Sequence, residues 1–151
     1  MIPKLDPQQA VPQIQGILAR GQLCRLQVTG TSMVPFLRSE KDAVILKGFD
    51  GNVKKGDLLF YKRANGQYIL HRVHSLCSDG TFLLCGDNQT VLEPVLPQQI
   101  IAAIAAIERN GKQFQPQNLL WRGLSRLWMG MFLLRPLLLK LMHGLWKILK
   151  G

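Results

Sequence analysis

The feature that most constrains the fold is a series of short β-type runs between residues 23 and 107, separated by turn residues. The sequence pairs Asn65-Gly66 and Asp79-Gly80 are typical of hairpin turns. Strands this short and this closely spaced predict a mainly β fold, a small antiparallel domain that is coiled or barrel-like. The predicted strands cover residues 23–28, 43–47, 57–63, 68–76, 81–85 and 100–108.

Helical patterns flank the β-rich region. Residues 8–21 carry apolar side chains at helical spacing, so we expect a short N-terminal helix within residues 1–22. The β domain is expected to span residues 23–108, and the polar residues 109–118 are expected to form a linker. At residue 119 the composition changes abruptly to Leu, Trp, Met, Arg and Lys, which predicts a helical tail over residues 119–151.

The net charge of +10 is concentrated in that tail. Residues 1–108 contain 11 Lys and Arg against 9 Asp and Glu, whereas residues 109–151 contain 8 basic residues and no acidic one. The β domain is therefore nearly neutral. Because nucleic-acid-binding tails are seldom this apolar, we do not expect a nucleic-acid partner.

The cysteines and histidines do not indicate a metal or another cofactor. Cys24, Cys77 and Cys85 lack the spacing of metal ligands and are expected to be free thiols in a reducing compartment. His71 and His74 are three residues apart, which places them on opposite faces of a strand. A shared metal ion is therefore not expected.

The tail has the pattern of helices that lie in a membrane interface, with cationic residues on one side and Leu and Trp on the other. Arg135-Pro136 is expected to divide it into two helices. We expect binding to an anionic lipid surface, while a helical pair docked on the protein and a re-entrant hairpin remain alternatives. The expected lipid-binding residues are Trp121, Arg122, Arg126, Trp128, Lys140, Trp146 and Lys147.

Targeting signals agree with attachment at a membrane surface. No apolar run reaches the 18 or more residues of a simple spanning helix, and residues 1–7 lack the apolar core of a cleaved signal peptide. The expected location is a membrane, at its cytoplasmic face.

Residues 30–35, Gly-Thr-Ser-Met-Val-Pro, place a serine in a segment of unusual backbone constraint. Gly30 permits a sharp backbone path before Ser32, and Pro35 fixes φ after it. Such a segment can expose the Ser32 hydroxyl at a strand end, with backbone N–H groups, including that of Ser32, free to stabilise an oxyanion. The same residues also suit an ordinary turn, so this segment alone does not decide between the two.

His71 lies in the predicted strand 68–76, which the turn at residues 78–81 joins to the strand 81–85. A hairpin centred on this turn brings His71 opposite the Asp87-Asn88 region, so one strand pair could supply a general base and the carboxylate that orients it. Strict alternation places Asn88, and not Asp87, on the face of His71. A bulge at Gly86 or an early strand end would bring Asp87 to that face.

These segments form four motifs that, in their order, resemble those of type I signal peptidases, most closely the Ser–His branch of the endoplasmic reticulum, archaea and some sporulating bacteria. The resemblance covers roughly residues 23–107. The motifs are Gly-Thr-Ser-Met-Val-Pro at 30–35, Lys-Gly-Asp-Leu-Leu-Phe-Tyr at 55–61, Ile-Leu-His-Arg-Val-His at 69–74 and Gly-Asp-Asn at 86–88.

The resemblance implies a coiled all-β peptidase domain in which Ser32 attacks the peptide carbonyl. It places His71 where the common bacterial branch and LexA-type repressors have lysine. Asp87 matches the aspartate of the Gly-Asp-Asn motif, and Glu93 falls where a second acidic residue often follows. The chain departs from the pattern at Gly30, because signal peptidases have a hydroxyl side chain two residues before the nucleophile. The usual N-terminal membrane anchor and the DNA-binding domain of the repressors are also not seen.

The expected function is therefore a serine endopeptidase that cleaves a leader or precursor peptide, with a peptide or membrane-associated protein as substrate. Two alternatives remain. The chain could be a non-catalytic regulatory module at a membrane surface that keeps the peptidase fold. It could also be a self-cleaving switch cut at one of two alanine pairs, 102–103 or 105–106.

Overall fold

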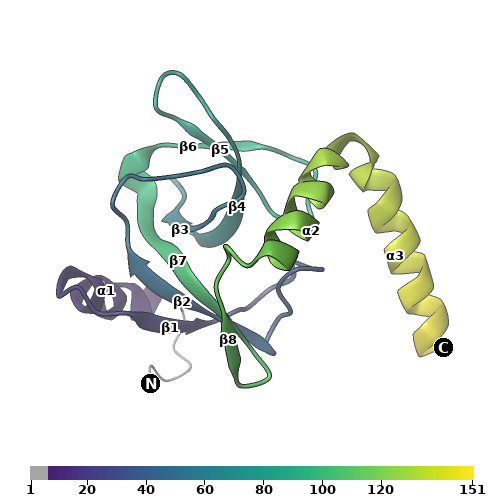
Figure 1. The fold of residues 1–151 in the computed structure, drawn as a ribbon, viewed down its shortest axis with the longest axis horizontal. Coiled ribbons are helices and arrows are strands. Elements are labelled where there is room, and N and C mark those ends of the chain that lie inside the picture. The colour runs from purple at the N-terminus through teal and green to yellow at the C-terminus, as the bar shows by residue number, and fades with distance from the viewer. Residues whose placement is uncertain (1–6) are drawn as a thin grey trace.

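The computed structural model describes residues 7–151 and shows one curved antiparallel sheet, in which the strands follow the order β1-β2-β7-β3-β4-β5-β6 and β8 pairs with β7 (Figure 1). The mainly β, antiparallel class predicted from the sequence is confirmed. The strands are β1 (Cys24–Gln27), β2 (Asp42–Gly48), β3 (Leu58–Lys62), β4 (Tyr68–Leu76), β5 (Phe82–Cys85), β6 (Glu93–Val95), β7 (Ile100–Arg109) and β8 (Lys112–Phe114).

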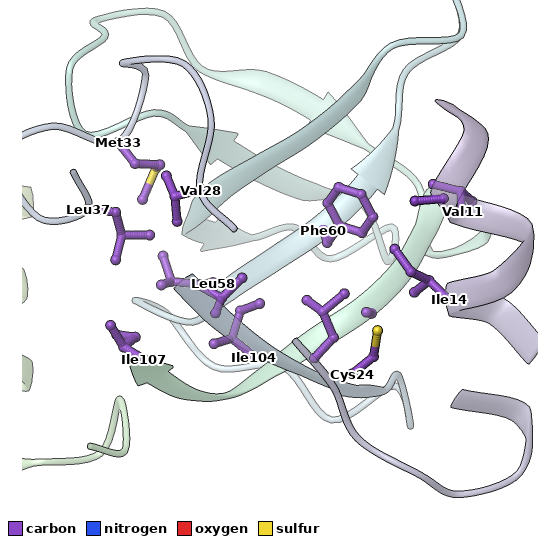
Figure 2. Close-up of a cluster of buried hydrophobic side chains, with 14 of the residues drawn as sticks. Val11, Ile14, Cys24, Val28, Met33, Leu37, Leu58, Phe60, Ile104 and Ile107 are labelled. Atoms are coloured by element: carbon purple, nitrogen blue, oxygen red, sulfur yellow. The ribbon is translucent and has the colours of Figure 1, made fainter. Parts of the chain in front are cut away.

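The curvature of the sheet encloses its main core, which helix α1 (Pro7–Ala19) closes at one end (Figures 1 and 2). Val11 and Ile14 of α1 reach this core, where Phe60 and Ile104 are also buried. Because both faces of the central strands are covered, β2 and β3 are buried at nearly every position and do not alternate. The predicted N-terminal helix is confirmed.

Two short strands depart from the prediction. Strand β6 pairs with β5, and β8 pairs with the end of β7. Neither strand is indicated by the sequence pattern, because three residues are too few to show a period of two. The segment 109–118, expected to be a linker, therefore holds a strand and extends the sheet.

The tail consists of α2 (Leu119–Gly130) and α3 (Arg135–Lys150), joined by a single 3-10 turn at Phe132–Leu134. The expected division into two helices is confirmed, although the break lies just before Arg135. Pro136 stands in the first turn of α3, where the missing N–H of proline has no helical partner to lose. Helix α2 packs on the sheet, whereas α3 extends away from it (Figure 1).

Two of the residues that were expected to bind lipid face the β domain instead. Trp121 and Trp128 are each only 8% exposed, because α2 turns them toward the β domain. Trp121 packs edge-on against Phe36 and close to Phe114. Trp146 of α3, in contrast, is 60% exposed. The structure therefore corrects the assignment of Trp121 and Trp128 to a lipid-binding surface.

Candidate active site

Ser32 lies in the segment between β1 and β2, where the chain turns sharply. Gly30 has φ of +73°, a conformation that glycine adopts without strain, which agrees with the path expected before Ser32. The Ser32 carbonyl oxygen accepts a hydrogen bond of 2.8 Å from the Asn88 amide. Ser32 is thereby tied to the segment that follows β5, and its side chain is partly exposed.

His71 is buried in β4, and the pairing of β4 with β5 brings it beside Gly86. A Cβ atom at Gly86 would lie 2.6 Å from the Ser32 carbonyl oxygen and 3.0 Å from Nε2 of His71. The Ser32 segment and the Nε2 edge of the imidazole therefore border the same small space. The expectation that the hairpin brings His71 to the segment after β5 is met because β5 ends at Cys85, just before this glycine.

The opposite edge of the His71 ring contacts two side chains that form one polar group. The Tyr61 hydroxyl lies 3.2 Å from Nδ1 and also donates a hydrogen bond to Glu93. Oε1 of Glu93 lies 3.4 Å from the same nitrogen. Because the Tyr61 proton is given to Glu93, Nδ1 meets only acceptors and must carry the ring proton. The Nε2 lone pair is left on the side of Ser32.

Arg63 holds Glu93 in place. Its Nη2 and Nε atoms lie 2.8 and 2.9 Å from the two carboxylate oxygens, a bidentate arrangement. Tyr61 and Arg63 were not identified from the sequence as site residues. They are two apart in and just after β3, so they share a face of the strand, which is the one signal that could have indicated them.

The protonation states follow from this surrounding. Burial lowers the pKa of His71 to about 4, although the nearby Glu93 carboxylate raises it in part. Burial tends to raise the pKa of Glu93, but hydrogen bonds from Arg63 and Tyr61 outweigh it, so the net shift is downward. Burial and Glu93 together raise the pKa of Tyr61. At neutral pH the site thus holds a neutral imidazole, a carboxylate and an un-ionised phenol.

Asp87 does not occupy the place expected for it beside His71. Both of its carboxylate oxygens accept from Arg72, at 2.9 and 2.8 Å, and the two side chains are almost completely buried. The reason is strand alternation, because Arg72 follows His71 in β4 and points to the opposite face of the sheet. Glu93 is the carboxylate on the Nδ1 side of His71.

A cavity of about 440 Å³ opens beside Ser32. One wall is the chain from Leu26 to Met33, and the other is Tyr68 to Leu70 at the start of β4. β1 is an end strand of the sheet, and β5 pairs only with the part of β4 from Arg72 onward. Both walls therefore carry backbone groups that a further strand could pair with.

Comparison with models of known protein families, with curated proteins and with solved structures finds no match for this chain. Among residues 7–151, no group of three or more His, Cys, Asp or Glu side chains is arranged to hold a metal ion. The chemistry of the site must therefore be argued from its own geometry.

Proposed function

We propose that this chain is a serine endopeptidase that cleaves a leader or precursor peptide, with Ser32 as nucleophile and His71 as general base. The observation that carries the proposal is the orientation of His71. Its Nε2 edge borders the Ser32 segment at Gly86, while its Nδ1 edge contacts Tyr61 and Glu93. A general base needs this arrangement, with one ring nitrogen free to accept a proton and the other held by acceptors.

In the proposed reaction, Nε2 of His71 takes the Ser32 hydroxyl proton as the oxygen attacks the peptide carbonyl. The imidazolium that forms is stabilised by the Glu93 carboxylate and the Tyr61 oxygen. His71 then returns the proton to the leaving amine, and the peptide bond breaks to give an acyl-enzyme. A water molecule, deprotonated by His71, then attacks the ester, and His71 passes that proton to the Ser32 oxygen as the ester C–O bond breaks.

The oxyanion is assigned to backbone donors. No backbone hydrogen bond among residues 7–151 uses the Ser32 amide as donor, so this N–H is available to a substrate oxygen. A preorganised donor of this kind contributes about 3 kcal/mol to transition-state stabilisation in other hydrolases.

The substrate class follows from the cavity next to Ser32. An extended peptide can pair with the backbone at Thr29 and Gly30 on one side and Tyr68–Leu70 on the other, and its side chains then enter the cavity alternately. The alanine pairs 102–103 and 105–106 lie within β7, which is paired with β2, so the self-cleaving alternative is disfavoured.

The test compares wild type with Ser32→Ala and His71→Ala, each co-expressed with candidate precursor peptides and examined by intact mass spectrometry. Ser78→Ala and His143→Ala are matched controls, because both residues are exposed. We expect cleavage by wild type and both controls and none by the two site variants. Equal processing by Ser32→Ala and wild type would rule out the nucleophile and favour the non-catalytic module.

We also propose that the tail binds an anionic lipid surface at the cytoplasmic face of a membrane. The carrying observation is a stripe of exposed apolar side chains along α3, which recur at helical spacing. Leu134, Leu137, Leu141, Leu145 and Ile148 form this stripe and are 57%, 58%, 56%, 60% and 76% exposed. Lys140, Lys147 and Lys150 are exposed on another side of the helix.

Helix α2 carries further cations. Arg122 and Arg126 border a cavity of about 230 Å³, together with three lysines and two aspartates from the β2–β3 region. The three lysines, Lys47, Lys54 and Lys55, leave the cavity net positive beside Asp50 and Asp57. Within residues 7–151, no helix has both the length and the apolar character needed to cross a bilayer. Attachment is therefore proposed at the interface, with phospholipid headgroups meeting the cations.

Flotation with vesicles tests this assignment. Wild type is expected to float with vesicles that contain 30% anionic phospholipid and less with vesicles of phosphatidylcholine alone, since each nearby basic residue contributes about 1 kcal/mol. Leu141→Asp with Leu145→Asp should abolish flotation, whereas Leu96→Asp, an exposed loop leucine far from the tail, should not. Equal flotation of wild type and the double variant would contradict the proposal. A concentration-dependent dimer without flotation would assign the stripe to a second copy of the chain.

A further inference from the structure

The loop from Gly86 to Gln89 is held from behind by two side chains of the tail. The indole Nε1 of Trp128, in α2, donates a hydrogen bond of 2.9 Å to the Asp87 carbonyl oxygen. Nη1 of Arg135, at the start of α3, lies 3.1 Å from the Gln89 carbonyl oxygen and 3.5 Å from that of Gly86. Three carbonyl groups of one loop thus accept from donors that lie 41, 49 and 46 residues further along the chain.

Arg135 is buried at this contact, which is unusual for a charged residue. It is only 2% exposed, and its guanidinium lies 5.3 Å from the ring centre of Trp128 and 4.9 Å from that of Phe132. Nη2 lies 3.3 Å from the Trp128 carbonyl oxygen. Among residues 7–151 it forms no ion pair with a carboxylate, and its surroundings are backbone carbonyls, aromatic faces and the Cys85 Sγ, 3.7 Å from Nη1, while its Nε has no hydrogen-bond partner. Burying an arginine in this way is unfavourable unless its several donors fix a geometry that an apolar side chain could not.

The same loop forms one side of the candidate site. The Asn88 amide donates to the Ser32 carbonyl oxygen at 2.8 Å. Gly86 lies so close to the Ser32 carbonyl oxygen and to Nε2 of His71 that a side chain there would force these groups to shift. A shift of the loop would therefore move Ser32 relative to His71, and misplacement by about 1 Å can lower a catalytic rate by about a hundredfold.

We propose that Trp128 and Arg135 are positioning residues, which hold the Gly86–Gln89 loop so that Ser32 and His71 stay aligned. The tail is on this account part of the catalytic unit as well as a lipid-binding element. The inference rests on the proposed peptidase function for its catalytic meaning, but the holding of the loop is a structural claim that can be measured without any substrate.

The decisive variant is Trp128→Phe, which keeps an aromatic ring beside Arg135 and removes the donor to Asp87 together with one ring of the indole. Two quantities are measured on the full chain: hydrogen exchange of the Asn88 amide, and kcat and KM on a peptide that wild type cleaves. Loss of one buried hydrogen bond predicts about tenfold faster exchange at Asn88 and about tenfold lower kcat, with KM nearly unchanged. Arg135→Met should have a larger effect of about a hundredfold, and Arg135→Lys an intermediate one.

Arg20→Met is the matched control, because Arg20 is exposed beyond α1, remote from the loop. The exchange of buried amides in β7 shows whether each variant is folded, and Trp128→Phe serves even where Arg135→Met does not fold. Unchanged Asn88 exchange and unchanged kcat in Trp128→Phe would overturn the inference. A rise in KM alone would overturn the positioning role as well. If wild type cleaves no peptide, the peptidase proposal fails by itself. Faster exchange at Asn88 in Trp128→Phe then still supports the holding of the loop, and unchanged exchange overturns it.

Discussion

The candidate site and helix α3 use polar and apolar groups in opposite ways. At the site, His71 and Asp87 are each 1% exposed, and the carboxylates of Glu93 and Asp87 each pair with an arginine. Along α3, only Arg135 and Leu139 are buried, and both leucines and lysines face outward. The polar groups of the site therefore have their partners within the chain. Most of the α3 surface, in contrast, has no partner among the described residues.

This difference separates what each region can do. A buried network fixes protonation and direction, which suits chemistry on a bound peptide. An exposed amphipathic helix gains little stability from the rest of the chain and so is free to bind a surface. Paired substitutions, one in each region, test whether the two regions differ in this way.

The largest contrast is expected between two glycines. Gly86→Ala places a methyl group against the Ser32 carbonyl oxygen and His71, so we expect activity to fall by about a thousandfold through displacement of the site. Gly144→Ala in α3 meets no neighbouring atom within 4 Å and should stabilise the helix by about 0.5–1 kcal/mol. Peptide cleavage and thermal unfolding of the two variants provide the comparison. Comparable activity in both would contradict the close approach at Gly86.

Two tryptophans give the next contrast. Trp121→Ala should lower the free energy of unfolding by about 3–5 kcal/mol, because the ring is packed between Phe36 and Phe114. Trp146→Ala should change it by less than about 0.5 kcal/mol, since the ring is mostly exposed, and should instead weaken vesicle binding. Urea unfolding and flotation measure the two effects. A stability loss of similar size in both variants would show that α3 packs on the domain in solution.

A smaller effect is expected from Glu93→Gln. The amide can donate to Nδ1 of His71, which favours the ring tautomer that has its proton on Nε2 and cannot accept one from Ser32. We expect kcat to fall by about a hundredfold, as measured on a peptide cleaved by wild type. Glu108→Gln, which loses only the contact with Arg25 on the far strand, is the control. Full activity of Glu93→Gln would remove Glu93 from the site.

The smallest effect concerns pH. Because burial lowers the pKa of His71 to about 4, kcat/KM should stay constant from neutral pH downward and fall only near pH 4. Between the ordinary histidine pKa and about 4, the unfolded chain binds the proton that the folded chain excludes, so stability should decrease as pH falls through this range. A fall in kcat/KM as the pH drops through about 6.5 would contradict the buried, neutral His71.

The sequence predicted much of the region that is governed by strand alternation. The six longer strands, the hairpin around residues 78–81 and the approach of His71 to the segment after β5 all follow from local pattern. It did not predict the role of Arg72, because a local pattern does not show which strand residue a buried carboxylate meets. The assignment of Asp87 to His71 requires a bulge at Gly86 or an early strand end, whereas Asp87 lies with Arg72, on the side that strict alternation places it.

The tail shows a different limit of sequence reasoning. Tryptophan and leucine at helical spacing suit both a protein core and a lipid interface, and nothing local distinguishes them. Trp121 and Trp128 face the β domain, whereas Trp146 does not, and only the path of the chain through the turn at Phe132–Leu134 decides this. Arg135, which the sequence indicates only as the division between the two helices, is also the buried contact to the site loop.

The most direct test of the central claim is the rate at which purified wild type and Ser32→Ala cleave the same extended peptide, selected from a fluorogenic library at neutral pH. The account predicts that kcat/KM of Ser32→Ala is lower by at least about a thousandfold, because the covalent route is lost while the fold and the cavity remain. Equal rates for the two proteins would contradict it and would leave the cavity beside Ser32 as a binding site without nucleophilic chemistry.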